Sequence, residues 1–336
     1  MKIIVAENFV QKPFVSVVVP SYNRANTVSQ TLDSILNQQC DFDFEIIIGD
    51  DCSTDNARGI LLNYQTKYPE KIKLLFYDEN IGLGANWATC IKHCNGKYIA
   101  NCDNDDYWHN PQKLQLQINF MEENPQYGLC HTDYRTHNRK TGKIREYVGE
   151  IGGEGNEEIQ AQSIMYHRFS CCNASVMYHK SVLLQYINLD DYINFHFSLQ
   201  DWNTWMLIAP FTKFRCLHIS TATFGIETQS ITRPQNIDKM NEKWKKQKAC
   251  YQYICKKLPQ VYPYNENEYD QLEYASCLDY AYAKMDYRIA KKYALLLNNK
   301  SLRVRFAKNR FLFYLYALAG KLRIMIILKA PNEYYR

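Results

Sequence analysis

Three carboxylate side chains lie within four residues of the sequence, at Asp103, Asp105 and Asp106. They directly follow the mainly apolar run 97–100, which predicts a β-strand. Like charges this close raise one another's pKa, so the cluster is costly unless a cation neutralises it. Hard divalent cations such as Mg²⁺ are held in proteins by one or two carboxylates together with substrate phosphates. The cluster therefore predicts a metal site that binds a diphosphate.

The first 135 residues are expected to position this cluster, because predicted strands alternate with predicted helices along them. The strands are expected at 15–19, 44–48, 72–77 and 98–102, and the helices at 28–36, 55–69, 85–93 and from Pro111 onward. Such alternation predicts an α/β fold in which a mostly parallel sheet is flanked by helices. Ligands of these sheets bind beyond the carboxyl ends of the strands, and we expect the site there.

Polar residues follow each of the four predicted strands. They are Ser21 to Arg24 after the first strand, Asp50 and Asp51 after the second, Asn80 after the third, and Asp103 to Asp106 after the fourth. Because these strands are predicted to be parallel, the polar residues should converge at one edge of the sheet. Arg24 is interpreted as a solvated surface charge and is left out of the predicted site. A further strand is expected at 173–178 and a helix at 201–209.

Charge and cysteine content bound the class of protein. The net charge is +5, and nine basic residues lie from Lys300 onward against one acidic residue, Glu333. Because the basic surplus belongs to this tail, no nucleic-acid partner is expected. The twelve cysteines include no C-x-x-C pair, and the opening residues lack a signal-peptide pattern. Reduced thiols and a cytoplasmic location are therefore predicted.

With these residues in view, the chain resembles family 2 glycosyltransferases, which are inverting, nucleotide-sugar-dependent enzymes of the GT-A fold. The resemblance covers residues 14–235 and depends on motifs that occur in a fixed order. They are VVPSYNR at 18–24, DDCSTD at 50–55, Asn80-Ile81-Gly82 with Asn86, GKYI at 96–99, Asp103 to Asp106 with Pro111 and Leu114, and QDW at 200–202. One Asp-x-Asp element alone is weak evidence, whereas the ordered set is specific.

The resemblance implies which residues bind the donor. Pro20 and Tyr22 match residues that line the nucleobase pocket, and Asp51 matches the carboxylate that accepts a hydrogen bond from the base. Asn80 belongs to the same donor-binding set, and Asp103 matches the first Asp of the Asp-x-Asp element, near the ribose. A fixed acceptor that faces an N–H group discriminates well, because a wrong partner leaves it buried and unpaired.

The resemblance also implies a divalent metal cofactor, Mn²⁺ or Mg²⁺. Asp105 matches the metal ligand, Asp103 lies near the metal, and Asp106 is a further candidate ligand, directly or through water. The family often carries a His in the segment that matches 224–230, but this chain has none there and Glu227 is the nearest candidate ligand. No glycine-rich phosphate-binding pattern is present, so the metal should do much of the diphosphate binding.

Asp201 matches the family's general base, which takes the proton of the acceptor hydroxyl. At the start of a helix the dipole favours its ionised form, so a nearby carboxylate or partial burial is needed to raise its pKa. The preceding residue is commonly Glu in the family but is Gln200 here, which removes one charge. Residues 170–175 match the region near the acceptor.

We therefore expect a lead-in at 1–13, a GT-A catalytic domain at 14–235 and a C-terminal α-helical region at 236–336. The expected function is metal-dependent, inverting hexosyl transfer from a nucleotide sugar, preferably a UDP-sugar. The acceptor would be a carbohydrate hydroxyl of a cell-surface or lipid-linked glycan. The alternatives are a catalytically impaired nucleotide-sugar-binding protein and, less favoured, a nucleotidyltransferase, which usually needs a basic, glycine-rich triphosphate loop.

The C-terminal tail has two interpretations. Its apolar stretch at 311–328 is interrupted by Gly320, Lys321 and Arg323, so it falls short of the roughly 18 apolar residues of a spanning helix. Basic residues followed by apolar ones predict peripheral contact with anionic lipid on the cytoplasmic face of a membrane. The other interpretation is a helical cap on the catalytic domain with its basic residues facing water.

Overall fold

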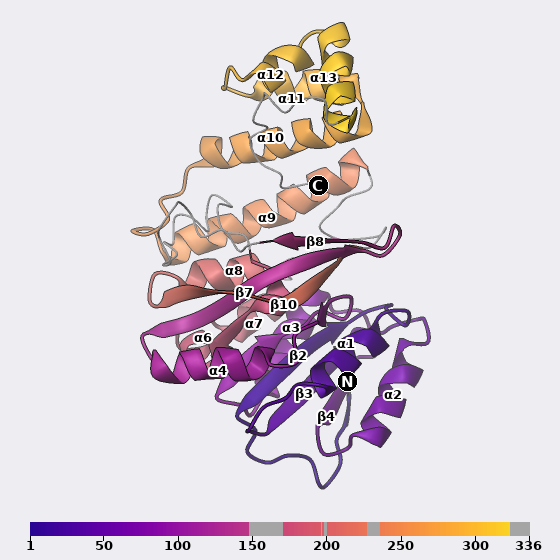
Figure 1. Ribbon diagram of the computed structural model, residues 1–336. Coiled ribbons are helices and arrows are strands. Elements are labelled where there is room, and N and C mark those ends of the chain that lie inside the picture. Colours follow the sequence, from indigo (N-terminus) through magenta and orange to yellow (C-terminus); the bar gives the residue numbers. More distant parts are fainter. Residues whose placement is uncertain (148–170, 196, 198–199, 227–235, 323–336) are drawn as a thin grey trace. The chain divides into compact units, whose positions relative to one another are not determined.

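The computed structural model describes residues 1–147, 171–195, 197, 200–226 and 236–322 (Figure 1). Within them a ten-stranded sheet runs in the order β1-β4-β3-β2-β5-β9-β7-β10-β6, and β8 pairs with β7. The strands are β1 (Lys2–Ile4), β2 (Val15–Ser21), β3 (Phe44–Asp50), β4 (Ile72–Phe76), β5 (Tyr98–Asn101), β6 (Tyr107–Trp108), β7 (Tyr127–Asn138), β8 (Lys143–Tyr147), β9 (Met177–His179) and β10 (Lys213–Ile226). The predicted α/β class with a helix-flanked sheet is confirmed.

The four strands expected in the first 135 residues form the parallel part of the sheet, in the order β4-β3-β2-β5. Every residue of β2, β3 and β5 is buried, because helices cover both faces. The apolar residues of α1 (Val28–Leu36), α2 (Ala57–Lys67) and α4 (Lys113–Glu123) share one core with one face of these strands. The other face carries α3 (Leu83–Lys92) (Figure 1).

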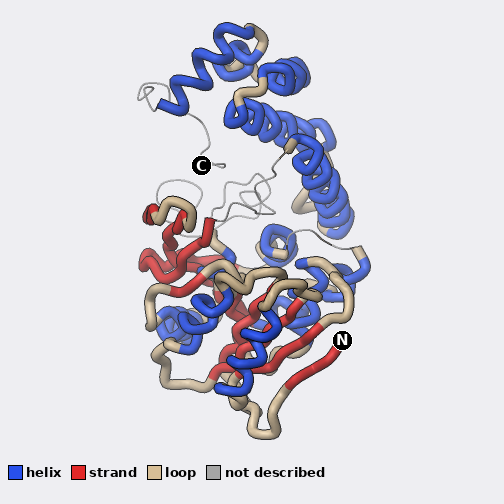
Figure 2. Tube along the Cα trace, turned by 90° about the vertical axis from the view of Figure 1, so that its right-hand side faces the viewer, coloured by secondary structure: helices blue, strands red, loops and turns tan. Residues whose placement is uncertain are grey.

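The rest of the sheet is mixed. Strand β9 lies between β5 and β7 and is antiparallel to both, whereas β7 and β10 are parallel to each other. The strand expected at 173–178 begins only at Met177, because Asn173–Ser175 forms a 3₁₀ turn, η1. Helix α4 begins at Lys113, shortly after Pro111. Figure 2 shows the strands of the sheet in red, with helices beside them.

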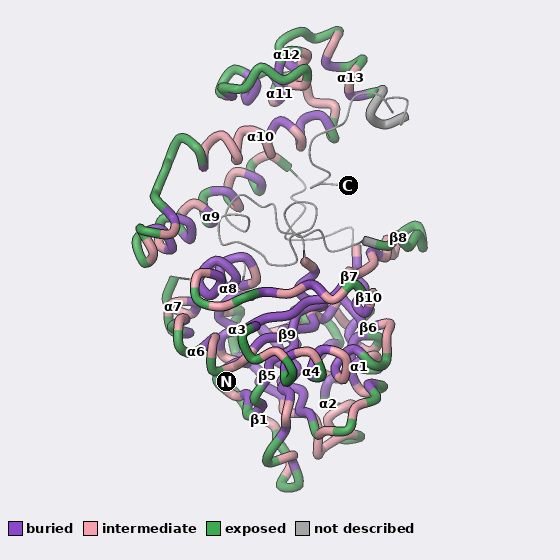
Figure 3. The backbone as a smooth tube through the Cα atoms, turned by 60° about the vertical axis from the view of Figure 1, so that its left-hand side comes forward, coloured by how far each residue is buried: buried purple, intermediate pink, exposed green. Residues whose placement is uncertain are grey.

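The lead-in expected at 1–13 takes part in the sheet, because β1 pairs antiparallel with β4 at its edge. After β9 come α6 (Lys180–Tyr186), α7 (Leu189–Asn194) and α8 (Asp201–Ile208). The helix expected at 201–209 is thus α8, which places Asp201 at its first position. Figure 3 shows the central strands of the sheet as largely buried.

The chain divides into two compact units. The first comprises residues 1–228 together with 253–262, and the second comprises 229–252 together with 263–336. Helix α9 (Ile237–Lys257) therefore contributes to both units. Compared with the expected domain 14–235, the first unit also includes residues 1–13 and 253–262, whereas 229–235 fall in the second unit.

The second unit is helical in its described part. Besides the first part of α9, it contains α10 (Glu266–Lys284), α11 (Tyr287–Leu296), α12 (Leu302–Ala307) and α13 (Arg310–Leu322). Side chains of Asn265, Asp286 and Ser301 cap the first three of these helices by accepting backbone N–H groups. Among the described helices, none combines the length and apolar character needed to cross a bilayer.

Candidate active site

The polar residues that follow β2, β3 and β5 meet at the carboxyl edge of the parallel strands. The backbone N–H of Asp51 donates to the carbonyl of Ser21 at 2.8 Å. The side-chain amide of Asn104 donates to the Ser21 hydroxyl at 2.9 Å. Three loops that are distant in sequence are thereby joined at one edge, as the parallel order of their strands requires.

Asp51 is a rigidly held carboxylate at this edge. Its Oδ1 accepts the N–H of Ile81 at 2.7 Å and its Oδ2 accepts that of Gly82 at 3.0 Å. Burial raises the pKa of Asp51, while these two backbone donors act to lower it. The exposed Asn80 donates from its amide to the Asp51 carbonyl at 3.3 Å. Gly82 has a φ of 86°, a conformation that glycine adopts without strain.

The loops after β2 and β3 brace each other. Asn23 and Cys52 both have positive φ, at 50° and 59°, which is uncommon for residues other than glycine. The Asn23 side-chain oxygen accepts the N–H of Thr54 at 2.8 Å, and the Asn23 N–H donates to the Ser53 hydroxyl at 2.9 Å. These contacts hold the loop of Tyr22, a side chain that remains 46% exposed, next to the loop of Asp51.

Pro20 lies buried within β2, one residue before that strand ends. Its ring fixes the local φ and leaves the residue without a backbone N–H. Of the two residues expected at the nucleobase, the structure therefore offers Tyr22 at the surface, whereas Pro20 shapes the strand beneath it.

Asp103 is held by a buried amide. Asn173 of η1 donates to its two carboxylate oxygens at 3.3 and 3.2 Å. Burial and the neighbouring charge of Asp105 raise the pKa of Asp103 to about 7, against the lowering effect of the Asn173 hydrogen bond. The charge of Asp201 also contributes to this rise, so the general base expected from the resemblance lies in the electrostatic environment of Asp103.

Asp105 has a cationic neighbour that the sequence interpretation left out. The Arg24 Nε lies 3.2 Å from Asp105 Oδ2, and both side chains are about a quarter exposed. Arg139 of the turn after β7 donates to the Asp105 carbonyl at 2.9 Å. The available signal was the position of Arg24 at the end of the motif after β2, because Pro20 and Tyr22 of the same motif were assigned to the site.

Asp106 faces the protein interior and is 1% exposed. Its Oδ1 accepts the Gly225 N–H at 2.8 Å, and the Cys172 thiol donates to its Oδ2 at 3.8 Å. Burial, then the charges of Asp105 and Asp103, raises the pKa of Asp106 well above its usual range. Because both oxygens have protein partners, this geometry favours a structural role over the candidate metal contact.

Asp201 opens α8, as expected, and its Oδ1 accepts the N–H of Trp202 at 2.7 Å. Gln200, which stands where the family commonly has Glu, is buried, and its carbonyl accepts the Thr204 N–H at 3.2 Å. Glu227, Ser170 and most of the segment 224–230 lie outside the described residues.

Asp103 and Asp105 fit a hard divalent cation. Both offer carboxylate oxygens, the ligand type that Mg²⁺ and Mn²⁺ prefer. After burial, the charge of Asp105 is the next cause of the raised pKa of Asp103, and a cation held by these carboxylates would offset that repulsion.

Comparison with known proteins agrees with this fold and identifies the family. The family model described as Glycosyl transferase family 2 matches residues 16–187, which is just over half of the chain. The chain belongs to glycosyl transferase family 2.

The alignments with individual relatives cover smaller parts of the chain than the family model does. TuaG of Bacillus subtilis, named for teichuronic acid biosynthesis, is 40% identical over 112 residues, which are 33% of this chain and 43% of TuaG. An uncharacterized protein of Mycobacterium tuberculosis is 35% identical over 115 residues, 34% of this chain and 33% of that protein. The matched regions thus span less than half the length of these relatives.

Among solved structures, TarS of S. aureus (residues 1–349) in complex with UDP-GlcNAc is similar, with a TM-score of 0.53 and 17% identity. The match covers 93% of this chain and 92% of that one. The same protein in complex with UDP gives a TM-score of 0.51 over 97% of this chain and 93% of that one, also at 17% identity. At this identity the likeness establishes the fold.

Proposed function

We propose that the protein is a metal-dependent, inverting glycosyltransferase that moves a hexose from a nucleotide sugar to a carbohydrate hydroxyl. The observation that carries the proposal is the gathering of Asp51, Asp103 and Asp105 at the carboxyl edge of the parallel strands, with the charge of Asp201 among those that raise the pKa of Asp103. Membership of family 2 supports the reaction class. The likeness to TarS, which was crystallised with UDP-GlcNAc, makes a UDP-sugar the first donor to test.

Asp51 is suited to hold the nucleobase. Two backbone N–H groups fix its carboxylate, which leaves lone pairs on each oxygen for a base N–H. Because the carboxylate cannot move away, a base without a matching donor would leave these remaining lone pairs without a hydrogen bond. Tyr22 and Asn80, both exposed beside it, complete the proposed donor-binding set with Pro20 and Asp103.

Asp103 and Asp105 would hold Mn²⁺ or Mg²⁺. A divalent cation bound there supplies Lewis-acid stabilisation for the charge that grows on the diphosphate leaving group. Asn173 orients Asp103 for this role, and Arg24 places a second positive charge next to Asp105. Carboxylate ligands for a cation and an arginine that can donate to phosphate oxygens thus lie at the same edge of the sheet.

Asp201 would act as the general base. Its carboxylate accepts the proton of the acceptor hydroxyl while that oxygen forms a bond to the anomeric carbon. The bond from this carbon to the diphosphate breaks on the opposite face, and its electron pair leaves with the nucleoside diphosphate. Attack on the face opposite the leaving group inverts the anomeric configuration.

Release of nucleoside diphosphate from a panel of nucleotide sugars, with and without Mn²⁺, tests the proposal. Asp201→Asn should lower turnover by about 100- to 10,000-fold, because the base is lost. Asp105→Ala should lower it by at least about 100-fold, because several kcal/mol of charge stabilisation are lost. Asp43→Asn, at an exposed position before β3, is the matched control and should retain activity. Full activity of either site variant would refute the role assigned to it.

The same assay separates the two alternatives. A catalytically impaired nucleotide-sugar-binding protein, which Gln200 in place of Glu would favour, should bind a donor without turnover on any acceptor. A nucleotidyltransferase should instead release pyrophosphate from a nucleoside triphosphate.

We also propose that the acceptor belongs to a cell-surface or lipid-linked glycan and that the second unit contacts the cytoplasmic face of a membrane. On α13 the exposed residues Phe311, Leu315 and Leu318 recur at helical spacing and form an apolar stripe. Arg305, Lys308 and Arg310, just before them, are exposed as well. A basic segment beside an apolar stripe suits the surface of an anionic bilayer.

A further inference from the structure

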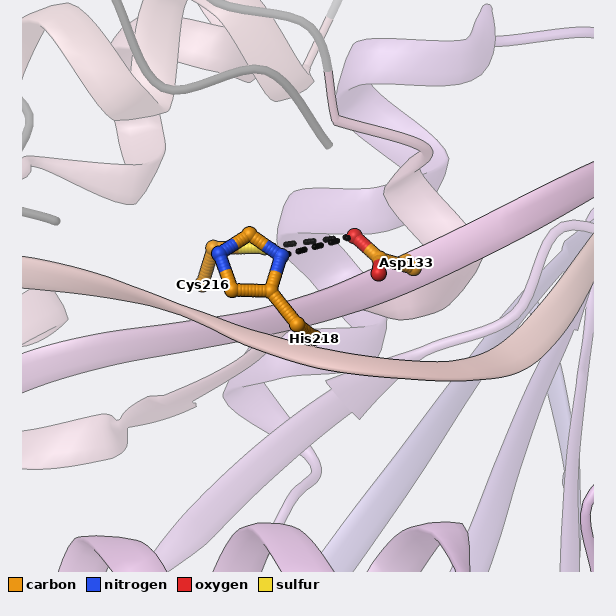
Figure 4. A group of neighbouring side chains, drawn as sticks. All are labelled: Asp133, Cys216 and His218. Atoms are coloured by element: carbon orange, nitrogen blue, oxygen red, sulfur yellow. Dashed lines mark hydrogen bonds and ion pairs between the residues drawn. The ribbon is translucent and has the colours of Figure 1, made fainter. Parts of the chain in front are cut away.

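Asp133 of β7 and Cys216 and His218 of β10 form a cluster of three different ligand types (Figure 4). The Cys216 Sγ lies 3.6 Å from Asp133 Oδ1 and 3.9 Å from His218 Nδ1. The third side of the triangle, His218 Nδ1 to Asp133 Oδ1, is 3.4 Å. One sulfur, one nitrogen and one oxygen atom thus face a common point.

A bulge in β10 creates this arrangement. Leu217 pairs with Thr132 and Ser220 pairs with Asp133, so β10 carries two extra residues opposite a single step of β7. His218 is one of these extra residues, and the bulge turns its ring towards Asp133. Bulges of this kind re-aim side chains and are frequent near functional sites.

The three distances agree with a tetrahedral metal. Bonds of about 2.3 Å to sulfur and about 2.0 Å to nitrogen and oxygen, at tetrahedral angles, separate the ligand atoms by roughly 3.3 to 3.6 Å. The observed separations are 3.4, 3.6 and 3.9 Å. Only the sulfur–nitrogen distance is longer, and a small rotation of the half-exposed His218 ring would close it.

We propose that Asp133, Cys216 and His218 bind Zn²⁺. A thiolate and an imidazole select this metal over Mg²⁺ or Mn²⁺, which prefer oxygen ligands only. The site is therefore different in chemistry from the proposed donor site at Asp103 and Asp105. Three protein ligands leave a fourth coordination position, and the side chain of His218 is 52% exposed, so water can reach that position.

The cluster lies on the strand that also supports the donor site. Further along β10, the Gly225 N–H donates to the buried carboxylate of Asp106. A cation that ties β7 to the β10 bulge would fix the register of that strand. Zn²⁺ should therefore raise the thermal stability of the protein.

The competing explanation is a metal-free, hydrogen-bonded cluster in which Asp133 accepts from the thiol and the imidazole. Equilibrium dialysis of the untagged, full-length protein against Zn²⁺, followed by metal analysis, distinguishes the two. Replacement by Co²⁺ adds a spectroscopic test, because a thiolate ligand gives an intense charge-transfer band in the near ultraviolet. The proposal expects one Zn²⁺ per chain and this band.

Single substitutions assign the ligands. His218→Gln and Cys216→Ser should each weaken Zn²⁺ binding by at least about tenfold, and the serine variant should lose the thiolate band. His218 is exposed, so its variant tests the site even if the buried Cys216 variant fails to fold. Cys40→Ser, at a half-buried thiol that donates to the Phe42 carbonyl, is the control and should bind normally.

Asp105→Asn tests whether Zn²⁺ binding is independent of the proposed donor site. It should leave the Zn²⁺ stoichiometry and the Co²⁺ band unchanged, whatever it does to sugar transfer. Absence of stoichiometric Zn²⁺ in the folded wild type would overturn the proposal, as would equal affinity in the wild type and His218→Gln.

Discussion

The orientation of Asp103 is set by a buried chain of side-chain hydrogen bonds. Asn173 donates to Asp103, and its own oxygen accepts the amide of Asn101 at 2.9 Å. The Asn101 oxygen in turn accepts from Tyr178 at 3.2 Å and from the Trp87 indole at 3.4 Å. Because each group in this chain is satisfied by the next, Asp103 has little freedom to rotate.

Removal of the Asn173 side chain, the donor to Asp103, should impair activity without unfolding the protein. Asn173→Ala deletes a hydrogen bond to a charged group, which is worth about 1.5–3 kcal/mol. We expect kcat/KM to fall by about 10- to 100-fold. Asn119→Ala, on the exposed side of α4, is the control and should leave kcat/KM unchanged. Wild-type kinetics in the Asn173 variant would mean that Asp103 needs no such positioning.

Helix α4 buries polar side chains next to its apolar face. Leu114, Ile118 and Met121 form the expected apolar face, but Lys113 and Gln117 are also completely buried. The Lys113 Nζ donates to Gln117 Oε1 at 2.5 Å and lies 4.4 Å from the centre of the Trp108 ring. Burial lowers the pKa of Lys113 from 10.5 to about 8. A polar pair thus occupies a core position that periodicity alone assigns to apolar residues.

This lysine should make stability depend on pH. Between pH 8 and 10.5 the unfolded chain retains the Lys113 proton that the folded chain has released, so the free energy of unfolding rises with pH there. Relative to Lys113→Met, the wild type should gain up to about 3 kcal/mol across this window. Denaturant unfolding of both proteins at pH 8 and pH 10 measures the gain.

The exposed Lys140→Met serves as the control for this titration, because its ammonium group is in water in both states. If wild type and Lys113→Met differ by the same amount at both pH values, the buried lysine is not the cause.

The apolar stripe of helix α13 predicts binding to anionic membranes. The full-length protein should co-sediment with vesicles of anionic phospholipid, and Leu315→Glu should weaken this binding by about 10- to 100-fold, because burial of one leucine is worth about 1.5–3 kcal/mol. Leu184→Glu in α6 changes a leucine of similar exposure, 46% against 54%, and should bind as wild type does. Equal binding of both variants would exclude the stripe as the contact.

At the scale of the whole molecule, the chain leaves the first unit and returns to it. Residues 253–262 belong to the first unit although the segments on either side belong to the second. Tyr262 is completely buried, and its hydroxyl donates to the Met206 carbonyl of α8 at 2.9 Å. Tyr253 donates to the carboxylate of Asp191 in α7. The helices that follow β9 are therefore stabilised by residues beyond the expected domain boundary at 235.

Loss of the Tyr262 side chain should destabilise the first unit. Tyr262→Ala should lower the free energy of unfolding by about 3–5 kcal/mol, because it opens a cavity against α8. Tyr262→Phe, which loses only the hydrogen bond, should cost about 1 kcal/mol. Thermal and denaturant unfolding measure both. Tyr264→Ala, 44% exposed and two residues away, should be nearly neutral, and an equal loss there would argue against a specific contact with α8.

Much of the first unit was predictable because its signals are local. The β-branched run at 15–19 and the apolar run at 44–48 are β2 and β3, and the polar residues after them meet where parallel strands require it. Residues 170–175 were matched to the acceptor region, but the contact of Asn173 with Asp103 was not predicted, because the 3₁₀ turn that presents Asn173 interrupts what looks like an ordinary strand. The buried lysine of α4 was hidden as well, because its contact with the Trp108 ring of β6 is made only in the tertiary structure.

The sequence by itself determined the alternation of strands and helices, the family, and the edge of the sheet where the carboxylates gather. Tertiary structure alone decided which carboxylate faces inward, because Asp106 is paired by Gly225, 119 residues away. It also decided that Arg24 reaches Asp105 and that His218 faces Asp133. Local patterns encode burial and secondary structure, whereas contacts between distant residues depend on how the strands pair; the contacts of Asp106 and His218 depend on the register of β10 and its bulge, for which the sequence carries no local signal.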